Sequence, residues 1–215
     1  MSTPTELIYP LDRAFFARDP RRVARALLGK VLVRRGSVRR APGLRLAARI
    51  VEVEAYLGEN DLAAHAAAGR TSRNAVLFGP PGHAYVYFIY GNHYCLNVSC
   101  ESEGKAGSVL FRALEPLSGM EEMVRARGVT LRGSKDWPRL TSGPGRLAQA
   151  FGITRARDNG CDLTCAASSL WIGDDGYRAR GIRLTPRIGI TKAQDEPLRY
   201  ILDGNRFVSR KAQPK

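Results

Sequence analysis

Two β-forming runs separated by a glycine–asparagine pair constrain the fold of this chain more than any other stretch. Residues 83–90 (HAYVYFIY) and 93–99 (HYCLNVS) are rich in aromatic and β-branched side chains, and Gly91-Asn92 lies between them. Such a pair is typical of a two-residue turn that joins antiparallel strands. The sequence therefore predicts a β-hairpin with Tyr90 beside its turn, within an antiparallel sheet.

Other segments extend this sheet and place helices around it. Asp19-Pro20 is typical of a helix start, because aspartate caps the first amides and proline suits the first helical position. Strands are expected at residues 30–34, 44–56, 108–114, 170–172, 187–190, 198–202 and 207–209. We expect a single α+β domain over residues 1–215, with a mostly antiparallel sheet, a mobile start at residues 1–10 and no second domain.

The chain is strongly basic. It has 34 Lys and Arg against 20 Asp and Glu, a net charge of +14. This excess favours a polyanionic partner, of which nucleic acid is the commonest, although a solubility surface or a membrane-facing patch would give the same count. The N-terminus does not resemble a signal peptide, and no stretch has the roughly 18 apolar residues of a membrane span. We expect a cytoplasmic, nucleoid-associated protein.

One window runs against the overall charge. Residues 50–69 contain four acids and no Lys or Arg, and the strand pattern IVEVEAY places Glu52, Glu54 and Tyr56 on one face. A cluster of acids inside a basic protein needs a chemical reason. Our hypothesis is that Glu54 is the catalytic carboxylate of an enzyme whose basic remainder binds nucleic acid.

Two polar segments are candidate phosphate clamps. Arg70 and Arg73 lie among small polar residues, and the glycine-rich entry to a helix near residues 140–151 brings amide donors close to a basic side chain. The second group comprises Ser142, Gly143 and Arg146. Ordinary solvated loops would have the same composition. The second segment lacks the Lys-Ser/Thr of a P-loop, so ATP or GTP binding is not expected.

Three further residues have open interpretations. His65 stands alone in an alanine-rich segment, where a histidine is either functional or simply structural. Tyr90 belongs to an aromatic hairpin, which is commonly core, but an exposed tyrosine at its tip could act as a wedge between stacked bases. Arg112 lies inside an apolar strand, so its charge should be paired or point into a site.

Four motifs in this order resemble the alkyladenine (3-methyladenine) DNA glycosylase family. They are VEVEAYLG-x2-D-x-AAH, YVYFIYG-x-HYCLN-V-S, LFRALEP and LTSGPGRL, and the likeness runs from about residue 11 to residue 209. The resemblance implies a curled sheet with flanking helices and a protruding β-hairpin that enters DNA. It implies a monofunctional base-excision repair enzyme, most simply a monomer, acting on double-stranded DNA that contains damaged bases. The implied substrates are 3-methyladenine, 7-methylguanine, hypoxanthine and ethenoadenine.

The resemblance also implies roles for the reacting groups. Glu54 matches the family's general base, and Arg112 matches the arginine that contacts the site near the nucleophilic water. Tyr90 matches the intercalating tyrosine. Ile188 or Ile190 would form an apolar wall of the pocket, and the sequence does not say which.

The pocket itself follows from the same match. Tyr56, His65 and Tyr87 match the residues that enclose the flipped base, and Asn97 matches the gatekeeper of the pocket. A two-residue turn at 91–92 conflicts with this, because it would point Tyr87 and Asn97 to opposite faces unless a bulge or wider loop shifts the register.

Several chemistries are not expected. The cysteine spacings C-x4-C and C-x3-C and the three scattered histidines match no common metal site, so neither a metal nor a cofactor is predicted. The motif region 50–97 has no lysine, which argues against a lyase. Two alternatives stay open: a nucleic-acid-binding module that has no use for Glu54, and a nuclease or phosphoryl transferase that would need divalent metal.

Overall fold

The sheet is built around one long strand, β3 (Arg45–Tyr56), in a computed structural model that describes residues 8–35 and 45–209. Ile50, Val51 and Val53 are fully buried, so apolar contacts cover both faces of this strand. Its first half pairs with β2, its second half pairs with β9, and β6 runs along its other edge. Two acids of the acidic window, Glu52 and Glu54, therefore lie in the middle of the fold.

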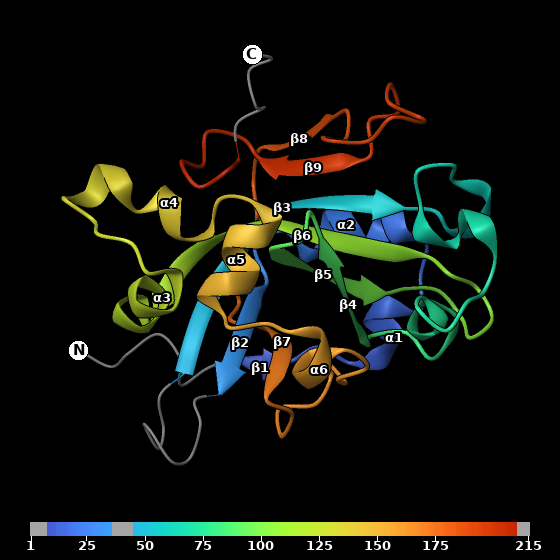
Figure 1. The fold of residues 1–215 in the computed structure, drawn as a ribbon, viewed down its shortest axis with the longest axis horizontal. Helices are drawn as coiled ribbons and strands as arrows, with labels where there is room; N and C mark the ends of the chain where they lie inside the picture. Colours follow the sequence, from blue (N-terminus) through green and yellow to red (C-terminus); the bar gives the residue numbers. More distant parts are fainter. Residues whose placement is uncertain (1–7, 36–44, 210–215) are drawn as a thin grey trace.

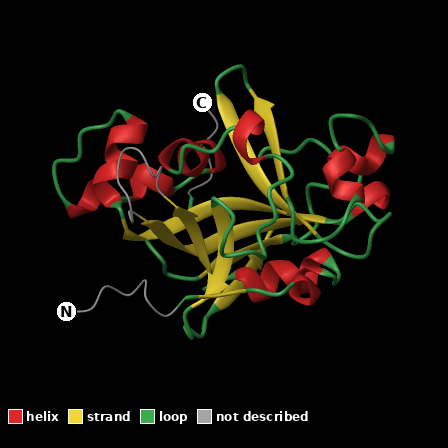
Figure 2. Ribbon diagram, turned by 90° about the horizontal axis from the view of Figure 1, so that it is seen from below, coloured by secondary structure: helices red, strands yellow, loops and turns green. Residues whose placement is uncertain are grey.

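All strand pairs in the described residues are antiparallel, and the order is β1-β7-β2-β3-β6-β5-β4, with β9 joining β3 to β8. The remaining strands are β1 (Tyr9–Pro10), β2 (Val31–Arg35), β4 (Ala84–Ile89), β5 (His93–Ser99), β6 (Ser108–Ser118), β7 (Leu170–Asp174), β8 (Ile182–Thr185) and β9 (Arg199–Leu202). Register shifts on either side of Glu52 bend β3 against β6, as β-bulges do. The sheet curls as a result, with helices on more than one side of it (Figure 2). This confirms the expected α+β fold.

The helices are short, and α2 begins with the predicted aspartate cap. They are α1 (Arg13–Phe16), α2 (Pro20–Leu27), α3 (Met120–Arg127), α4 (Pro138–Thr141), α5 (Pro144–Ala150) and α6 (Arg155–Asp158), with 3-10 turns η2 (Gly58–Asn60), η3 (His65–Ala68), η4 (Ala75–Phe78) and η5 (Ser134–Asp136). Asp19 caps α2 by accepting a hydrogen bond from the Arg21 amide, and α2 packs on β3. Helix α5 packs on β5 and β6, which brings its N-terminus to the hairpin (Figure 1).

The predicted two-residue hairpin turn is wrong. Ile89 pairs with His93, so three residues, 90–92, form the loop between β4 and β5. Tyr90 (φ 54°) and Gly91 (φ 70°) both adopt left-handed backbone, which a tyrosine rarely does. The extra loop residue shifts the register by one, and this shift has consequences for the pocket described below.

Two predicted strands are also wrong. Residues 187–190 and 207–209 form irregular backbone, and β8 at 182–185 is the strand that pairs with β9. The apolar alternation at 188 and 190 is the pattern that predicts a strand. In the fold it places both isoleucines against a cavity instead.

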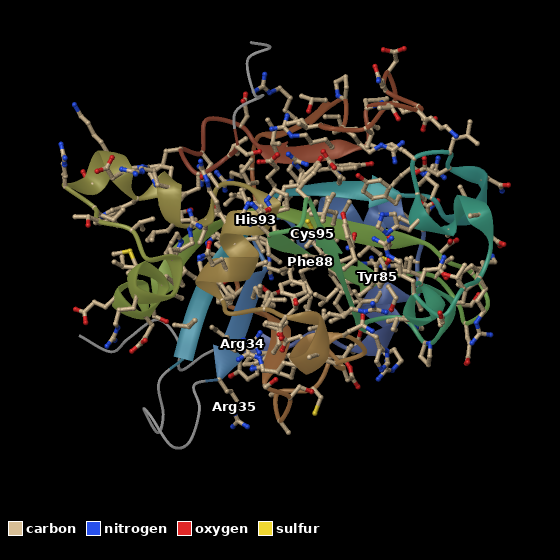
Figure 3. All side chains as sticks on the ribbon, viewed as in Figure 1. Arg34, Arg35, Tyr85, Phe88, His93 and Cys95 are labelled. Atoms are coloured by element: carbon tan, nitrogen blue, oxygen red, sulfur yellow. The ribbon has the colours of Figure 1, made fainter. Side chains whose placement is uncertain are left out.

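Part of the basic excess is structural. Arg34 is buried and forms two hydrogen bonds with Asp158, at 2.7 and 3.0 Å, whereas its neighbour Arg35 is exposed on β2 (Figure 3). A buried arginine of this kind cannot contact a polyanion. The positive charge available to DNA is therefore smaller than the composition suggests.

Residues 1–7 of the expected mobile start lie outside the described residues, while Tyr9 and Pro10 pair with β7. Within the described part of the chain, no helix has the length and apolar character needed to cross a membrane.

Candidate active site

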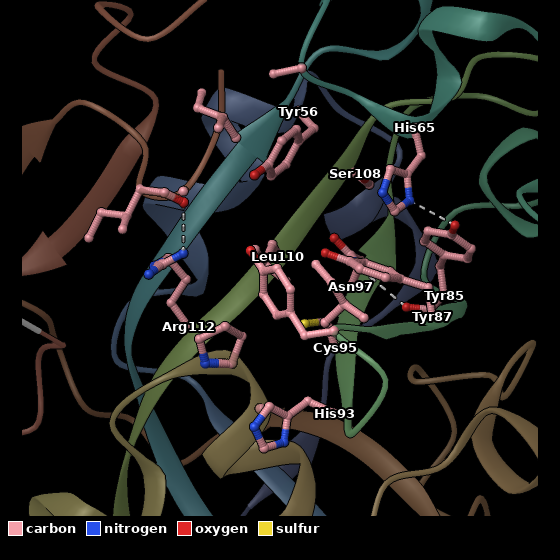
Figure 4. A pocket seen from close by; sticks show the side chains of 18 of the residues that line it. Tyr56, His65, Tyr85, Tyr87, His93, Cys95, Asn97, Ser108, Leu110 and Arg112 are labelled. Carbon is pink, nitrogen blue, oxygen red and sulfur yellow. Dashed lines mark hydrogen bonds between the residues drawn. The ribbon is translucent and has the colours of Figure 1, made fainter. Parts of the chain in front are cut away.

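A cavity of about 610 Å³ opens on the sheet where β3, β4, β5 and β6 meet (Figure 4). The η2–η3 segment, the start of α5 and the loop at 188–192 complete its walls. This volume is within the usual range for a small-molecule pocket. The cavity brings together segments that lie more than a hundred residues apart in the sequence.

The corrected hairpin register places Tyr87 and Asn97 on the same face. Tyr85 lies opposite Asn97 and Tyr87 lies opposite Cys95, so all four side chains belong to one side of the β4–β5 pair and all line the cavity. The conflict between the predicted turn and the pocket therefore disappears. The amide of Asn97 donates to the Tyr85 carbonyl at 3.4 Å, which limits its rotation.

Aromatic side chains form one wall of the cavity. The rings of His65 and Tyr87 are 4.4 Å apart at 68°, and His65 Nδ1 shares a 2.9 Å hydrogen bond with the Tyr85 hydroxyl. Burial, with a contribution from the charge of Arg73, lowers the pKa of His65. The shift favours the uncharged imidazole, one ring nitrogen of which shares a hydrogen bond with Tyr85.

Glu54 is completely buried directly behind the cavity wall. It accepts hydrogen bonds from the Ile188 amide (2.8 Å) and the Tyr56 hydroxyl (3.1 Å), and Arg112 Nη1 lies 3.2 Å from its carboxylate. All three of these residues line the cavity. Burial raises the pKa of Glu54, while Arg112, the Ile188 amide and the Tyr56 hydroxyl oppose that shift.

Arg112 also forms an ion pair with Glu52, the second buried acid of β3. Its Nε donates to Glu52 at 2.9 Å, and Glu52 further accepts from Arg199 Nε at 2.7 Å and from the amide and hydroxyl of Ser209. The charge of Arg112 is thus both paired and directed toward the site, the two outcomes expected for an arginine within an apolar strand.

Tyr90 lies at the tip of the hairpin with 79% of its surface exposed, although it also borders the cavity. An exposed tyrosine held in left-handed backbone is unfavourable for stability and is the kind of strain that is found at functional positions. Its geometry suits the predicted wedge, whose role stays a prediction.

The candidate phosphate contacts lie in two places, on the surface at 70–73 and beside the cavity at 142–146. Arg70 and Arg73 are exposed, and Gly143 and Arg146 line the cavity at the start of α5. Ser142 differs, because its hydroxyl donates to the Phe207 carbonyl at 2.6 Å. The fold therefore leaves Ser142 the least available of the five residues predicted to hold phosphate.

Both candidate isoleucines line the cavity, and only Ile188 also binds Glu54 through its amide. Sequence reasoning missed their neighbour Arg187, whose guanidinium packs 4.7 Å from the centroid of the Tyr56 ring. Its ion-pair partner is Asp61, 126 residues away. The signal available in the sequence was an arginine next to apolar residues, which needs a partner when buried.

No group of three or more His, Cys, Asp or Glu residues within ranges 8–35 and 45–209 could hold a metal ion. The four cysteines are free, and Cys95 lies in the cavity wall.

The site combines an aromatic cavity with a buried carboxylate beside it, in a strongly basic chain. A model of the family described as "Methylpurine-DNA glycosylase (MPG)" matches residues 14–206. The chain belongs to this family. It is therefore a monofunctional DNA glycosylase, a hydrolase that acts on DNA in the repair of alkylation damage.

Curated relatives cover nearly the whole chain. A protein of Koribacter versatilis named "Putative 3-methyladenine DNA glycosylase" is 61% identical over 202 residues, 94% of each chain. Proteins of the same name from Rhodopseudomonas palustris and Methanocella arvoryzae are 49% and 47% identical, over 96% and 88% of this chain and 93% and 88% of their own.

Proposed function

We propose that this enzyme flips damaged purines out of duplex DNA into the cavity and hydrolyses the N-glycosidic bond with a water activated by Glu54. The observation that carries the proposal is the position of Glu54, a fully buried carboxylate whose two hydrogen-bond donors and one ion-pair partner all border an aromatic cavity. A base inside the duplex stack is out of reach, so extrusion at a cost of a few kcal/mol must come first.

The bond chemistry uses Glu54 and Arg112. Water oxygen bonds to C1′ of the deoxyribose as the C1′–N bond breaks, and the base leaves with the electron pair. Glu54 takes the proton from the water, and its negative charge stabilises the oxocarbenium-like transition state. Arg112 holds the carboxylate in place and favours its ionised form. The product is an abasic site.

Tyr56, His65 and Tyr87 would enclose the extruded base, since every base offers a π-face and stacking contributes ~1–3 kcal/mol. Cationic bases such as 3-methyladenine and 7-methylguanine leave readily, and they gain from contact with electron-rich rings. Neutral hypoxanthine or ethenoadenine also needs a proton or a hydrogen bond on the leaving base. The Asn97 amide would exclude guanine by clashing with its exocyclic amine.

DNA binding in this proposal is electrostatic and independent of sequence. Arg70, Arg73, Gly143 and Arg146 would hold backbone phosphates near the cavity mouth, with Ser142 supporting the last turn before α5, so affinity should fall with salt. We propose that the enzyme is a monomer of the cytoplasm, where it encounters the nucleoid.

The decisive experiment compares wild type with Glu54→Gln on a duplex that contains hypoxanthine. The amide keeps the size of the side chain and an acceptor for Tyr56 but takes up no proton. We expect single-turnover excision to fall about 1,000-fold, within the usual range for loss of a general base, while lesion binding is retained. Equal inactivity of both proteins on every alkylated or deaminated base, with tight binding, would contradict the proposal. Excision that persists in a chelator would separate this chemistry from metal-dependent cleavage.

Base extrusion has its own test in Tyr90→Ala. Loss of the wedge should weaken affinity for a lesion duplex by roughly tenfold, the effect of one lost stacking contact. The matched control is Tyr9→Ala, because Tyr9 is also exposed but lies on β1, at the opposite end of the sheet. Unchanged lesion affinity in Tyr90→Ala would remove the wedge from the proposal.

A further inference from the structure

An ion pair lies behind the Tyr56 ring, outside the cavity. Arg187 Nη1 and Nη2 bind the two carboxylate oxygens of Asp61 at 2.5 and 3.0 Å, and both side chains are almost completely buried. The same guanidinium lies 4.7 Å from the centroid of the Tyr56 ring. Tyr56 lines the cavity and Arg187 does not, so this cation contacts the ring from outside the cavity.

The pair also connects three walls of the cavity. Arg187 donates to the Ala55 carbonyl at the end of β3, at 3.1 Å, and precedes Ile188, whose amide binds Glu54. Asp61 accepts from the amides of Leu57 and Ala63, at 3.1 and 3.0 Å. The turn between Tyr56 and His65 is therefore held to the loop that carries Ile188.

A buried charge acts on its neighbours with little screening by water. A cation over one face of an aromatic ring draws electron density toward itself, and the opposite face then attracts a second cation less strongly. Asp61 offsets part of this field, because it lies beside the guanidinium. The balance between Arg187 and Asp61 thus sets how strongly the free face of Tyr56 attracts positive charge.

We propose that the Arg187–Asp61 pair is a positioning and specificity-determining element that moderates the preference of Tyr56 for positively charged bases. By reducing the attraction of the ring for a cation, the pair favours neutral damaged purines relative to cationic alkylated ones. The inference rests on the proposed function, because it requires the base to stack on Tyr56.

Two substitutions with opposite expected effects test it. Asp61→Asn removes the compensating negative charge and leaves Arg187 in place, so the ratio of excision of cationic 7-methylguanine to neutral hypoxanthine should fall. The neutral pair Asp61→Asn with Arg187→Gln keeps two hydrogen-bonding side chains without charge, so the ratio should rise. Each shift should be about two- to fivefold, the range of a single cation–π contact.

The measurement is the single-turnover rate constant on matched duplexes with saturating enzyme, after subtraction of spontaneous loss of 7-methylguanine. The matched control is Arg183→Gln with Asp203→Asn, an exposed Arg–Asp pair at 2.9 Å in the β8–β9 region, which should leave the ratio unchanged. General loosening of the pocket would move both site variants in one direction, whereas the charge mechanism requires opposite directions.

Equal ratios in wild type and both variants, or shifts of the same sign, would overturn the inference. If the double variant fails to fold in a thermal melt, Asp61→Asn alone decides, and an unchanged or raised ratio overturns the inference. Failure of the proposed function looks different: a wild type that excises neither base, or a fully active Glu54→Gln, would overturn that first.

Discussion

Glu52 and Glu54 lie two residues apart on β3 and share the guanidinium of Arg112, yet their surroundings differ. Glu52 accepts hydrogen bonds from two arginines and from both the amide and the hydroxyl of Ser209. Glu54 binds one arginine, one amide and one hydroxyl, and each of these belongs to a residue in the cavity wall.

This difference separates stability from catalysis within one strand. Two cations compensate the charge of Glu52, and removing it would leave both of them short of a partner. Burial raises the pKa of Glu54, and Arg112 and two hydrogen bonds offset that shift only in part, which suits a group that must take up a proton. Bulges on either side of Glu52 allow neighbouring acids to meet such different environments.

The largest effect on stability is expected from Glu52→Gln. Loss of the charge breaks two buried ion pairs, and the free energy of unfolding should fall by about 3 kcal/mol, as is usual when one partner of a buried pair is removed. Urea denaturation measures it. The matched control is Glu59→Gln, an exposed acid of the same sequence window, which should change stability by less than about 0.5 kcal/mol. Equal effects of the two substitutions would show that Glu52 is not structural.

Arg112, which contacts both acids, allows their effects on stability and on excision to be separated more sharply. Arg112→Lys replaces a planar fork by a single ammonium, which cannot bind Glu52 through Nε and Glu54 through Nη1 together. Single-turnover excision should fall roughly a hundredfold, the lower end for loss of one preorganised donor. Arg199→Lys is the control, because Arg199 binds Glu52 but not Glu54, and it should lower stability while largely sparing excision. Equal losses of excision in Arg112→Lys and Arg199→Lys would contradict the division of Glu52 and Glu54 into a structural and a catalytic acid.

Local patterns in the sequence predicted much of the fold. The cap at Asp19, the long strand predicted at 44–56 and described at 45–56, and the pairing of the two hairpin strands all follow from short-range propensities, whereas the two-residue turn of the hairpin does not hold. Glu54 and Tyr56 share a face because alternation along a strand is a local rule, and a 3.1 Å hydrogen bond joins them. Each of these depends only on residues close in sequence.

Two features of the fold could not be predicted from local sequence patterns, one because of an unusual backbone conformation and one because of distant partners. The hairpin register depends on Tyr90 adopting left-handed backbone, which no propensity for tyrosine favours. The backbone at 187–190 is irregular because the Ile188 amide binds a carboxylate 134 residues away and Arg187 binds Asp61, rather than strand partners. The site therefore departs from local rules where the pocket wall is made.

The smallest effect is expected in the pH dependence of excision. Burial raises the pKa of Glu54, so excision of 7-methylguanine, which needs no proton on the leaving base, should fall as pH drops through a value above 4.5, that of a free glutamate. Single-turnover rates between pH 4 and 8 would show this limb, with DNA binding measured alongside as the control. If the excision rate fell only at or below pH 4.5, the pKa of a free glutamate, the role of Glu54 as the group that takes up the proton would be contradicted.

Stability should show the reverse trend. A raised pKa in the folded state means that protonated Glu54 stabilises the fold at low pH and that this contribution is lost as pH rises through the folded pKa. Glu54→Gln, which never ionises, should therefore match wild type in acid and become more stable than wild type near neutrality, by less than Glu52→Gln loses. Urea denaturation across the same pH range measures the difference. A Glu54→Gln protein less stable than wild type at pH 7 would place Glu54 with Glu52, as a structural acid.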